Sequence, residues 1–190
     1  MEILLNIDNY DKRMRLDNLN LSISEKESIK ETVNFGHVNR IDIVNIGTGV
    51  DWIVILLVIN IGFQLLKVGA ELNDGIDGWI GVGKKLWKLF RRKKIVSIDV
   101  AGATALAIAL IAQKEEIIKL EKIQESTVNL VDVSAANTNK KGLSKKPHNY
   151  YLQTYKINDE NVYVVGIEST GAGKILKYFR ISPFGIIDNK

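Results

Sequence analysis

The feature that most constrains this chain is the segment 49–94, which begins as its most apolar stretch and ends as its most basic. Residues 52–70 are apolar except at Asn60, Gln64 and a single lysine, and this composition predicts one long helix. A second helix is expected over 76–92, where cations surround the last turns and suit the helix macrodipole. A helix as apolar as the first must be buried, either by protein or by lipid.

Two observations favour burial in protein. A membrane-spanning helix needs about 20 apolar residues, and the amide of Asn60 falls near the middle of 52–70, where it is costly without a partner. Short strands are also expected on both sides of the run. The alternative is a membrane-inserting or membrane-anchored protein that uses 52–70. It is supported by the basic stretch 84–94, which follows the run as the cytoplasmic flank that the positive-inside rule requires.

The candidate interaction residues are the tryptophans, amides and cations of this segment, because these groups contact protein partners and anionic membrane surfaces. They are Trp52, Asn60, Gln64, Trp79, Lys84, Lys85, Trp87, Lys88, Arg91, Arg92, Lys93 and Lys94. Nucleic acid is a less favoured partner, since the formal net charge of the chain is only +4.

The rest of the chain predicts an α+β fold in which long apolar helices cover a small mixed sheet. Short apolar runs and alternation of apolar and polar residues predict strands. Short apolar runs lie at 2–8 and 95–100, and alternating segments lie at 13–22 and 40–46. A capping-box pattern at Ser24 and Glu27 opens a short helix, and a long helix is expected from Ala105 to about Gln124, with an amphipathic second half.

The C-terminal part predicts a three-stranded antiparallel meander. Its expected strands are 149–157, 162–168 and 174–182, rich in aromatic and β-branched residues. The polar, basic stretch 134–148 before them has the composition of a linker. The expected organisation is an α/β domain over 1–133, the linker 134–148 and a β subdomain over 149–190.

No catalytic, cofactor or metal site is expected. The glycine-rich stretch from Gly166 to Lys174 lacks the first glycine and the hydroxyl of a phosphate loop, and it precedes a strand where a helix is needed, so a hairpin turn is predicted. The turn 47–49 lacks the third glycine of a dinucleotide fingerprint. The histidines, His37 and His148, have no companion ligand at metal spacing. The chain contains no cysteine.

The order of the elements resembles the small effector-associated modules of bacterial conflict systems over roughly the first 125 residues. The resemblance is carried by MEILLNID, the helix ISEKESIKETV, RIDIVNIGTG, DWIVILLVINIGFQLL, the basic end KLFRRKK and IVSIDV. Such modules act as adaptors and not as enzymes. The resemblance implies a non-catalytic protein-interaction module of a bacterial defence system, which binds another protein or itself. The absence of cysteine and of a signal-peptide pattern predicts a cytoplasmic location, with association at an anionic membrane surface as the alternative.

Overall fold

The computed structural model describes residues 1–6, 23–33, 36–45, 53–60, 66–92, 95–129, 148–182 and 185–188. In chain order the elements are β1 (Glu2–Asn6), α1 (Ile23–Thr32), β2 (His37–Asn45), β3 (Ile53–Asn60), β4 (Glu71–Leu72), α2 (Ile76–Arg91), β5 (Ile95–Ile98), α3 (Val100–Ile111), β6 (Leu120–Asn129), β7 (Asn149–Ile157), β8 (Asn161–Glu168), β9 (Gly173–Ser182) and β10 (Gly185–Asp188). The strands form a four-stranded sheet, β2-β3-β1-β5, and a six-stranded sheet, β10-β9-β8-β7-β6-β4. The α+β class is confirmed, and the described pairings of both sheets are antiparallel.

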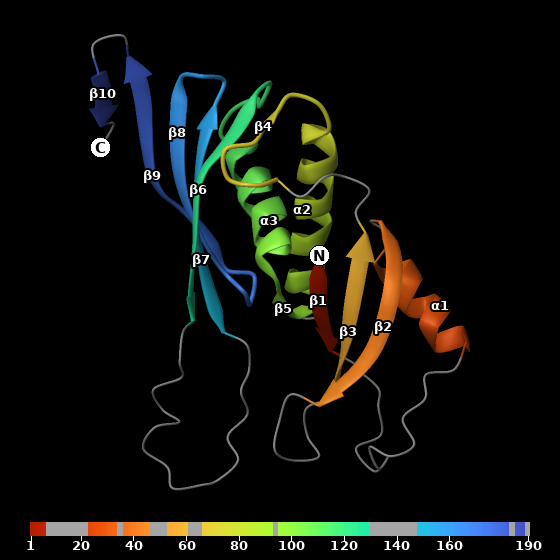
Figure 1. Ribbon diagram of the computed structural model, residues 1–190. Helices are drawn as coiled ribbons and strands as arrows, with labels where there is room; N and C mark the ends of the chain where they lie inside the picture. The colour runs from red at the N-terminus through yellow and green to blue at the C-terminus, as the bar shows by residue number, and fades with distance from the viewer. Residues whose placement is uncertain are drawn as a thin grey trace, which may run out of the picture.

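Helix α3 lies between the two sheets (Figure 1). It contacts β7, β8 and β9 on one side and β1 and β5 on the other. Its sequence, VAGATALAIALI, is apolar all round, as a helix enclosed by protein requires. The helix begins at its N-cap Asp99, whose Oδ1 accepts a hydrogen bond from the Gly102 N–H at 2.9 Å. The other oxygen, Oδ2, accepts one from the Glu2 N–H at 2.8 Å, so Asp99 joins the central helix to β1.

Helix α2 packs against α3 at short range because residue 83 is glycine. A Cβ at Gly83 would lie 2.1 Å from the carbonyl oxygen of Ala105 and 2.6 Å from the Cβ of Ala109. The core-facing side of α2 is otherwise built from large apolar groups. These are Ile76, Trp79, Val82, Leu86 and Leu89. The helix predicted over 76–92 is confirmed, and the opposite side of α2 faces outward.

The helix expected over 52–70 is wrong, because residues 53–60 form β3, which pairs with β1 and β2. An apolar run has no polar face from which a period can be read, so it fits a buried strand as well as a buried helix. Five of the eight residues of IVILLVIN are β-branched, which favours the strand. Asn60 ends the strand and is exposed. Among the described residues no helix has the length and apolarity needed to cross a bilayer.

The helix expected from Ala105 to Gln124 is wrong in its second half. Helix α3 ends at Ile111, and residues 120–129 form β6. The helical spacing of Ile117, Leu120 and Ile123 does not mark one buried face, because Leu120 is buried whereas Ile123 is 41% exposed. A β-bulge lies at this point of β6, where the register against β7 shifts between Lys122 and Gln124. The extra residue turns Glu125 to the same side of the sheet as Lys122. Residues three positions apart therefore share a face here, as they would on a helix.

The C-terminal meander is confirmed as β7, β8 and β9, with β10 added at its edge. The stretch from Gly166 to Lys174 forms the end of β8, a turn and the start of β9, as predicted. Strand β6 pairs with β7 from Leu120 opposite Ile157 to Asn129 opposite Asn149, so the six-stranded sheet contains strands from both sides of the expected linker 134–148. That linker, apart from His148, and the strand expected at 13–22 lie outside the described residues.

Candidate interaction surface on helix α2

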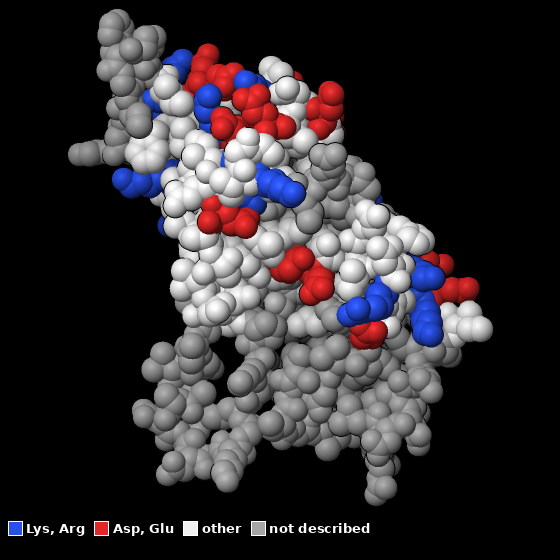
Figure 2. All heavy atoms as spheres, in the orientation of Figure 1, with Lys and Arg blue, Asp and Glu red and all other residues white. Residues whose placement is uncertain are grey.

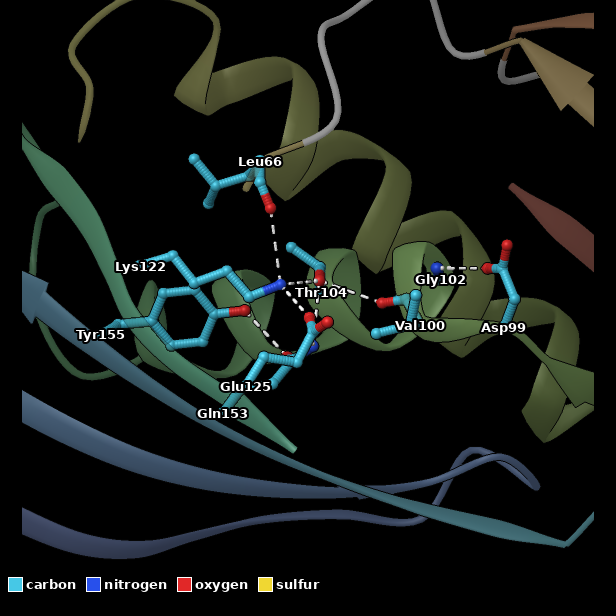
Figure 3. A network of polar contacts seen from close by, with 9 residues as sticks. All are labelled: Leu66, Asp99, Val100, Gly102, Thr104, Lys122, Glu125, Gln153 and Tyr155. Atoms are coloured by element: carbon cyan, nitrogen blue, oxygen red, sulfur yellow. Dashed lines mark hydrogen bonds and ion pairs between the residues drawn. The ribbon is translucent and has the colours of Figure 1, made fainter. Parts of the chain in front are cut away.

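A buried polar network lies between α3 and the six-stranded sheet (Figure 3). Lys122 of β6 is 2% exposed, and its Nζ donates hydrogen bonds to Thr104 Oγ1 at 3.1 Å and to the Leu66 carbonyl oxygen at 3.5 Å. The same Nζ forms an ion pair with the carboxylate of Glu125. The bulge in β6 makes this pair, since without it the two side chains would point to opposite faces of the sheet.

The network continues onto β7. Gln153 Nε2 donates to Thr104 Oγ1 at 3.0 Å and to Glu125 Oε2 at 3.3 Å, and the Tyr155 hydroxyl donates to Gln153 Oε1 at 2.8 Å. Thr104 donates its own proton to the Val100 carbonyl at 3.0 Å, so its hydroxyl makes all the bonds that a hydroxyl can make. Burial raises the pKa of Tyr155 well above its usual range, so the phenol is a neutral donor. These contacts link α3 to the sheet and turn the polar groups toward one another.

The outward face of α2 is the candidate functional surface. Residues spaced three or four apart share a face of a helix. On α2 this face carries Asp77, Ile80, Gly81, Lys84, Trp87, Lys88 and Arg91, which are exposed or half-buried. It lies opposite the core side that contains Trp79 and Leu86. The helical spacing of the cations in KKLWKLFR was visible in the sequence, and it is what gathers them here.

A basic groove of about 240 Å³ runs along the C-terminal half of this face. It is lined by Lys84, Trp87, Lys88, Arg91 and, from the end of α3, Gln113. Three of these five residues are cations and none is acidic. The Arg91 guanidinium lies 5.8 Å from the centre of the Trp87 ring, within the range of a cation–π contact. The groove therefore combines positive charge with an aromatic surface.

An acidic cavity of about 550 Å³ adjoins the N-terminal half of the same face, and Lys84 also lines it. Its acidic residues are Asp74, Asp77, Glu115 and Glu116. The Glu115 Oε2 accepts a hydrogen bond from Asn161 Nδ2 at 2.7 Å. The cavity was not predictable from the sequence, because it combines the start of α2 with the loop after α3, which was expected to be helix.

The structure brings together four of the residues predicted as interaction candidates, namely Lys84, Trp87, Lys88 and Arg91. Lys85 and Arg92 are exposed beside the groove but do not line it. Trp79 is fully buried in the core, and Asn60 ends β3, so neither belongs to this surface. The remaining candidates lie outside the described residues. They are Trp52, Gln64, Lys93 and Lys94.

A second group of charges lies at the end of the molecule that carries β4 and the β7–β8 turn, where acidic and basic side chains are interspersed (Figure 2). The Asp159 carboxylate accepts from Lys156 at 2.9 Å and from Lys119 at 3.0 Å, and these bonds lower its pKa. Lys119 also lies 3.3 Å from Glu71. Lys119 and Lys156 are thus both paired with carboxylates of the same group.

The same end is held by Asn158, in the turn between β7 and β8. Its side-chain Oδ1 accepts from the backbone N–H groups of Ile118 and Lys119 at 2.9 and 3.0 Å, and its Nδ2 donates to the Glu116 carbonyl at 2.8 Å. Its φ of 52° lies in the left-handed region, which Asn tolerates better than most residues. Asn158 thus fixes the loop that borders the acidic cavity.

His37 is exposed at the start of β2, and His148 lies 3.7 Å from Glu168. Over the described part of the chain, no three His, Cys, Asp or Glu residues lie together as a metal site. Comparisons with known protein families, curated proteins and solved structures find no match. Fold and surface define an α+β protein in which α3 lies between two antiparallel sheets and α2 presents a basic groove.

Proposed function

We propose that the protein is a non-catalytic interaction module, an adaptor of a bacterial defence system in the cytoplasm, which binds an acidic surface of a partner protein through the basic groove of α2. The observation that carries the proposal is the convergence of Lys84, Lys88 and Arg91 around Trp87 in a groove with no acidic lining residue. Arginine and tryptophan are the residues most enriched where protein interfaces gain their binding energy.

The interior of the molecule supports a binding role. Between α3 and the sheet, Lys122 is bonded to Glu125 and Thr104, and Gln153 is bonded to Glu125 and accepts from Tyr155. A catalytic acid or base must reach a substrate atom, directly or through one water. These groups instead link α3 to the sheet, whereas the cations that line the groove of α2 are exposed.

The test is calorimetric titration of the protein with a hexaglutamate peptide at low and at physiological salt. Binding is expected to weaken with salt, because exposed charges are screened. Lys88→Glu together with Arg91→Glu should weaken it by about tenfold or more, since each cation contributes roughly 0.5–1 kcal/mol and its reversal adds repulsion. The matched control is Lys174→Glu, a charge reversal at an exposed lysine of β9 that does not line the groove. Equal weakening by the control, or no binding by the unaltered protein, contradicts the proposal.

A second candidate is contact with an anionic membrane surface, with Trp87 at the interface. Each Lys or Arg near such a surface contributes about 1 kcal/mol, and the groove holds three of them. Sedimentation with vesicles of phosphatidylcholine, with and without phosphatidylserine, separates the two candidates. Binding only to phosphatidylserine vesicles, abolished by the groove reversals, favours the membrane; no sedimentation alongside peptide binding favours the protein partner.

A further inference from the structure

The outward face of α2 has opposite charge at its two ends. Asp77 lies near its N-terminal end beside the acidic cavity, and Arg91 lies at its C-terminal end in the basic groove. The two residues are 14 positions apart, which is about 21 Å along a helix. A surface with this distribution is complementary to itself when two copies lie antiparallel, because the acidic half of each copy then meets the basic half of the other.

The shape of the outward face of α2 is also complementary to that of an antiparallel copy. Gly81 has open space above it, since a Cβ there would meet nothing within 4 Å. Trp87, six residues later, is half-buried at the wall of the basic groove. The position midway between Gly81 and Trp87 is Lys84, and Lys84 is also midway between Asp77 and Arg91. One two-fold axis at Lys84 therefore brings each large group opposite a small one and each charge opposite its counter-charge.

We infer that the partner of this face is a second copy of the chain, bound with its α2 antiparallel about a two-fold axis at Lys84. In this pair Asp77 faces Arg91 of the partner subunit, and Trp87 packs on Gly81 of the partner subunit, as a symmetric interface requires. The inference rests on the proposed function, because it uses the same basic groove and names what fills it.

Lys84 of each copy would lie near the other at the axis, and this repulsion is offset by nearby carboxylates. Glu115 and Glu116 line the acidic cavity together with Lys84, so each copy supplies counter-charges next to the axis. A contact built from one helix and its flanking loop is at the small end of specific interfaces. The dimer is therefore weak, reversible and favoured by low salt.

Charge reversal and mixing test the inference by sedimentation equilibrium. In a dimer of Asp77→Lys, both symmetry-related contacts place a lysine against an arginine. In a dimer of Arg91→Glu, both contacts place an aspartate against a glutamate. Each variant alone should therefore self-associate at least about tenfold more weakly than the unaltered protein. When the two variants are mixed, a mixed dimer should form, because one of its contacts pairs the original aspartate with the original arginine and the other pairs the introduced lysine with the introduced glutamate. The double variant Asp77→Lys with Arg91→Glu should also dimerise. A mixture that associates no better than either variant alone overturns the inference.

Disulfide trapping tests the geometry independently of charge, because the chain contains no cysteine. Two helices packed about 8–10 Å apart bring facing Cα atoms to about 3.5–5.5 Å, which overlaps the range of Cα separations in disulfides. Lys84→Cys should therefore cross-link to its copy under mild oxidation. Lys88→Cys is the matched control, since it is equally exposed on the same face, but its copy would be shifted by about 12 Å along the axis. Equal cross-linking of both variants overturns the antiparallel register.

The second copy as partner and the proposed function can be refuted separately. If Asp77→Lys and Arg91→Glu do not associate on mixing but the unaltered protein binds hexaglutamate through its groove, the second copy is the wrong partner and the proposed function stands. If the peptide does not bind either, both are overturned. Circular dichroism of each variant verifies that α2 is still folded in these comparisons.

Discussion

Replacing Lys122 by methionine tests whether the buried polar network holds the six-stranded sheet against α3. The substitution removes the charge of a side chain that is 3% exposed and keeps most of its length. Thr104 keeps its bond from Gln153, and the contact to the Leu66 carbonyl is long at 3.5 Å, so neither loss is large. The main effect falls on the Glu125 carboxylate, which loses its cation.

The expected cost follows from the burial of the two partners. Breaking a fully buried ion pair by removing one partner costs about 3–5 kcal/mol. Because the Glu125 side chain is 27% exposed, water compensates part of the lost charge, and we expect Lys122→Met to lower the free energy of unfolding by about 2–3 kcal/mol. Glu125→Gln should cost at least as much, since it leaves the more deeply buried Lys122 without its counter-charge. The double variant should lie within about 1 kcal/mol of the unaltered protein, because no unpaired charge is left.

Urea unfolding followed by circular dichroism measures these differences. Gln124→Met is the matched control, because residue 124 is exposed on the same strand and its change should stay within about 0.5 kcal/mol. If Lys122→Met costs less than about 1 kcal/mol, or if the double variant costs as much as the two single variants together, the pair does not stabilise the core as argued.

Three further predictions concern packing, the β7–β8 turn and acid stability. Gly83→Ala should lower the free energy of unfolding by about 1–3 kcal/mol, because the added Cβ overlaps α3. Gly81→Ala lies in open space and should raise it by about 0.5–1 kcal/mol. Urea unfolding at low protein concentration measures both changes. Asn158→Ala removes three hydrogen bonds and should cost about 2–3 kcal/mol, while Asn158→Gly, free of strain at positive φ, should cost less in the same assay. Hydrogen bonds, chiefly from Lys156, lower the pKa of the Asp159 carboxyl below its ordinary value of 3.8. The stabilisation by this carboxylate is therefore present above pH 3.8 and is lost as the pH falls through the lowered pKa. The stabilities of Asp159→Asn and the unaltered protein should converge in acid.

The parts of the fold that were predictable are those in which apolar and polar residues repeat with a regular period. The strands at 149–157, 162–168 and 174–182 alternate clearly and are bounded by turn residues, and they were placed to within one residue. Helix α2 was predicted for the same kind of reason, since its apolar stripe and basic face repeat with the helical period. The basic groove could be anticipated because its cations and Trp87 lie on one such face.

The predicted elements that are wrong lie where the hydrophobic period is absent or misleading. Residues 53–60 carry no polar face, so burial was predictable and the type of element was not. At 117–123 three apolar residues repeat at helical spacing, yet Leu120 is buried and Ile123 is 41% exposed on the same strand. Lys122 and Glu125 share a face only because of the bulge between them. Their partners in the network, Thr104 and Gln153, are 49 residues apart in the sequence, and only the tertiary fold brings them together.

The sequence predicts two apolar helices, one over 52–70 and one that begins near Ala105, and only the second is a helix in the structure. This helix is α3, and its burial on both sides leaves it no surface with which to bind a partner. Helix α2 lies beside it with only its inner face covered, because Gly83 brings the two helices into close contact. The polar groups of the interior are bonded within the network around Lys122, whereas the cations of α2 lie in an open groove. Substitutions at Lys122 should therefore change stability and leave the affinity of the groove unaltered, and substitutions at Lys88 or Arg91 should do the reverse.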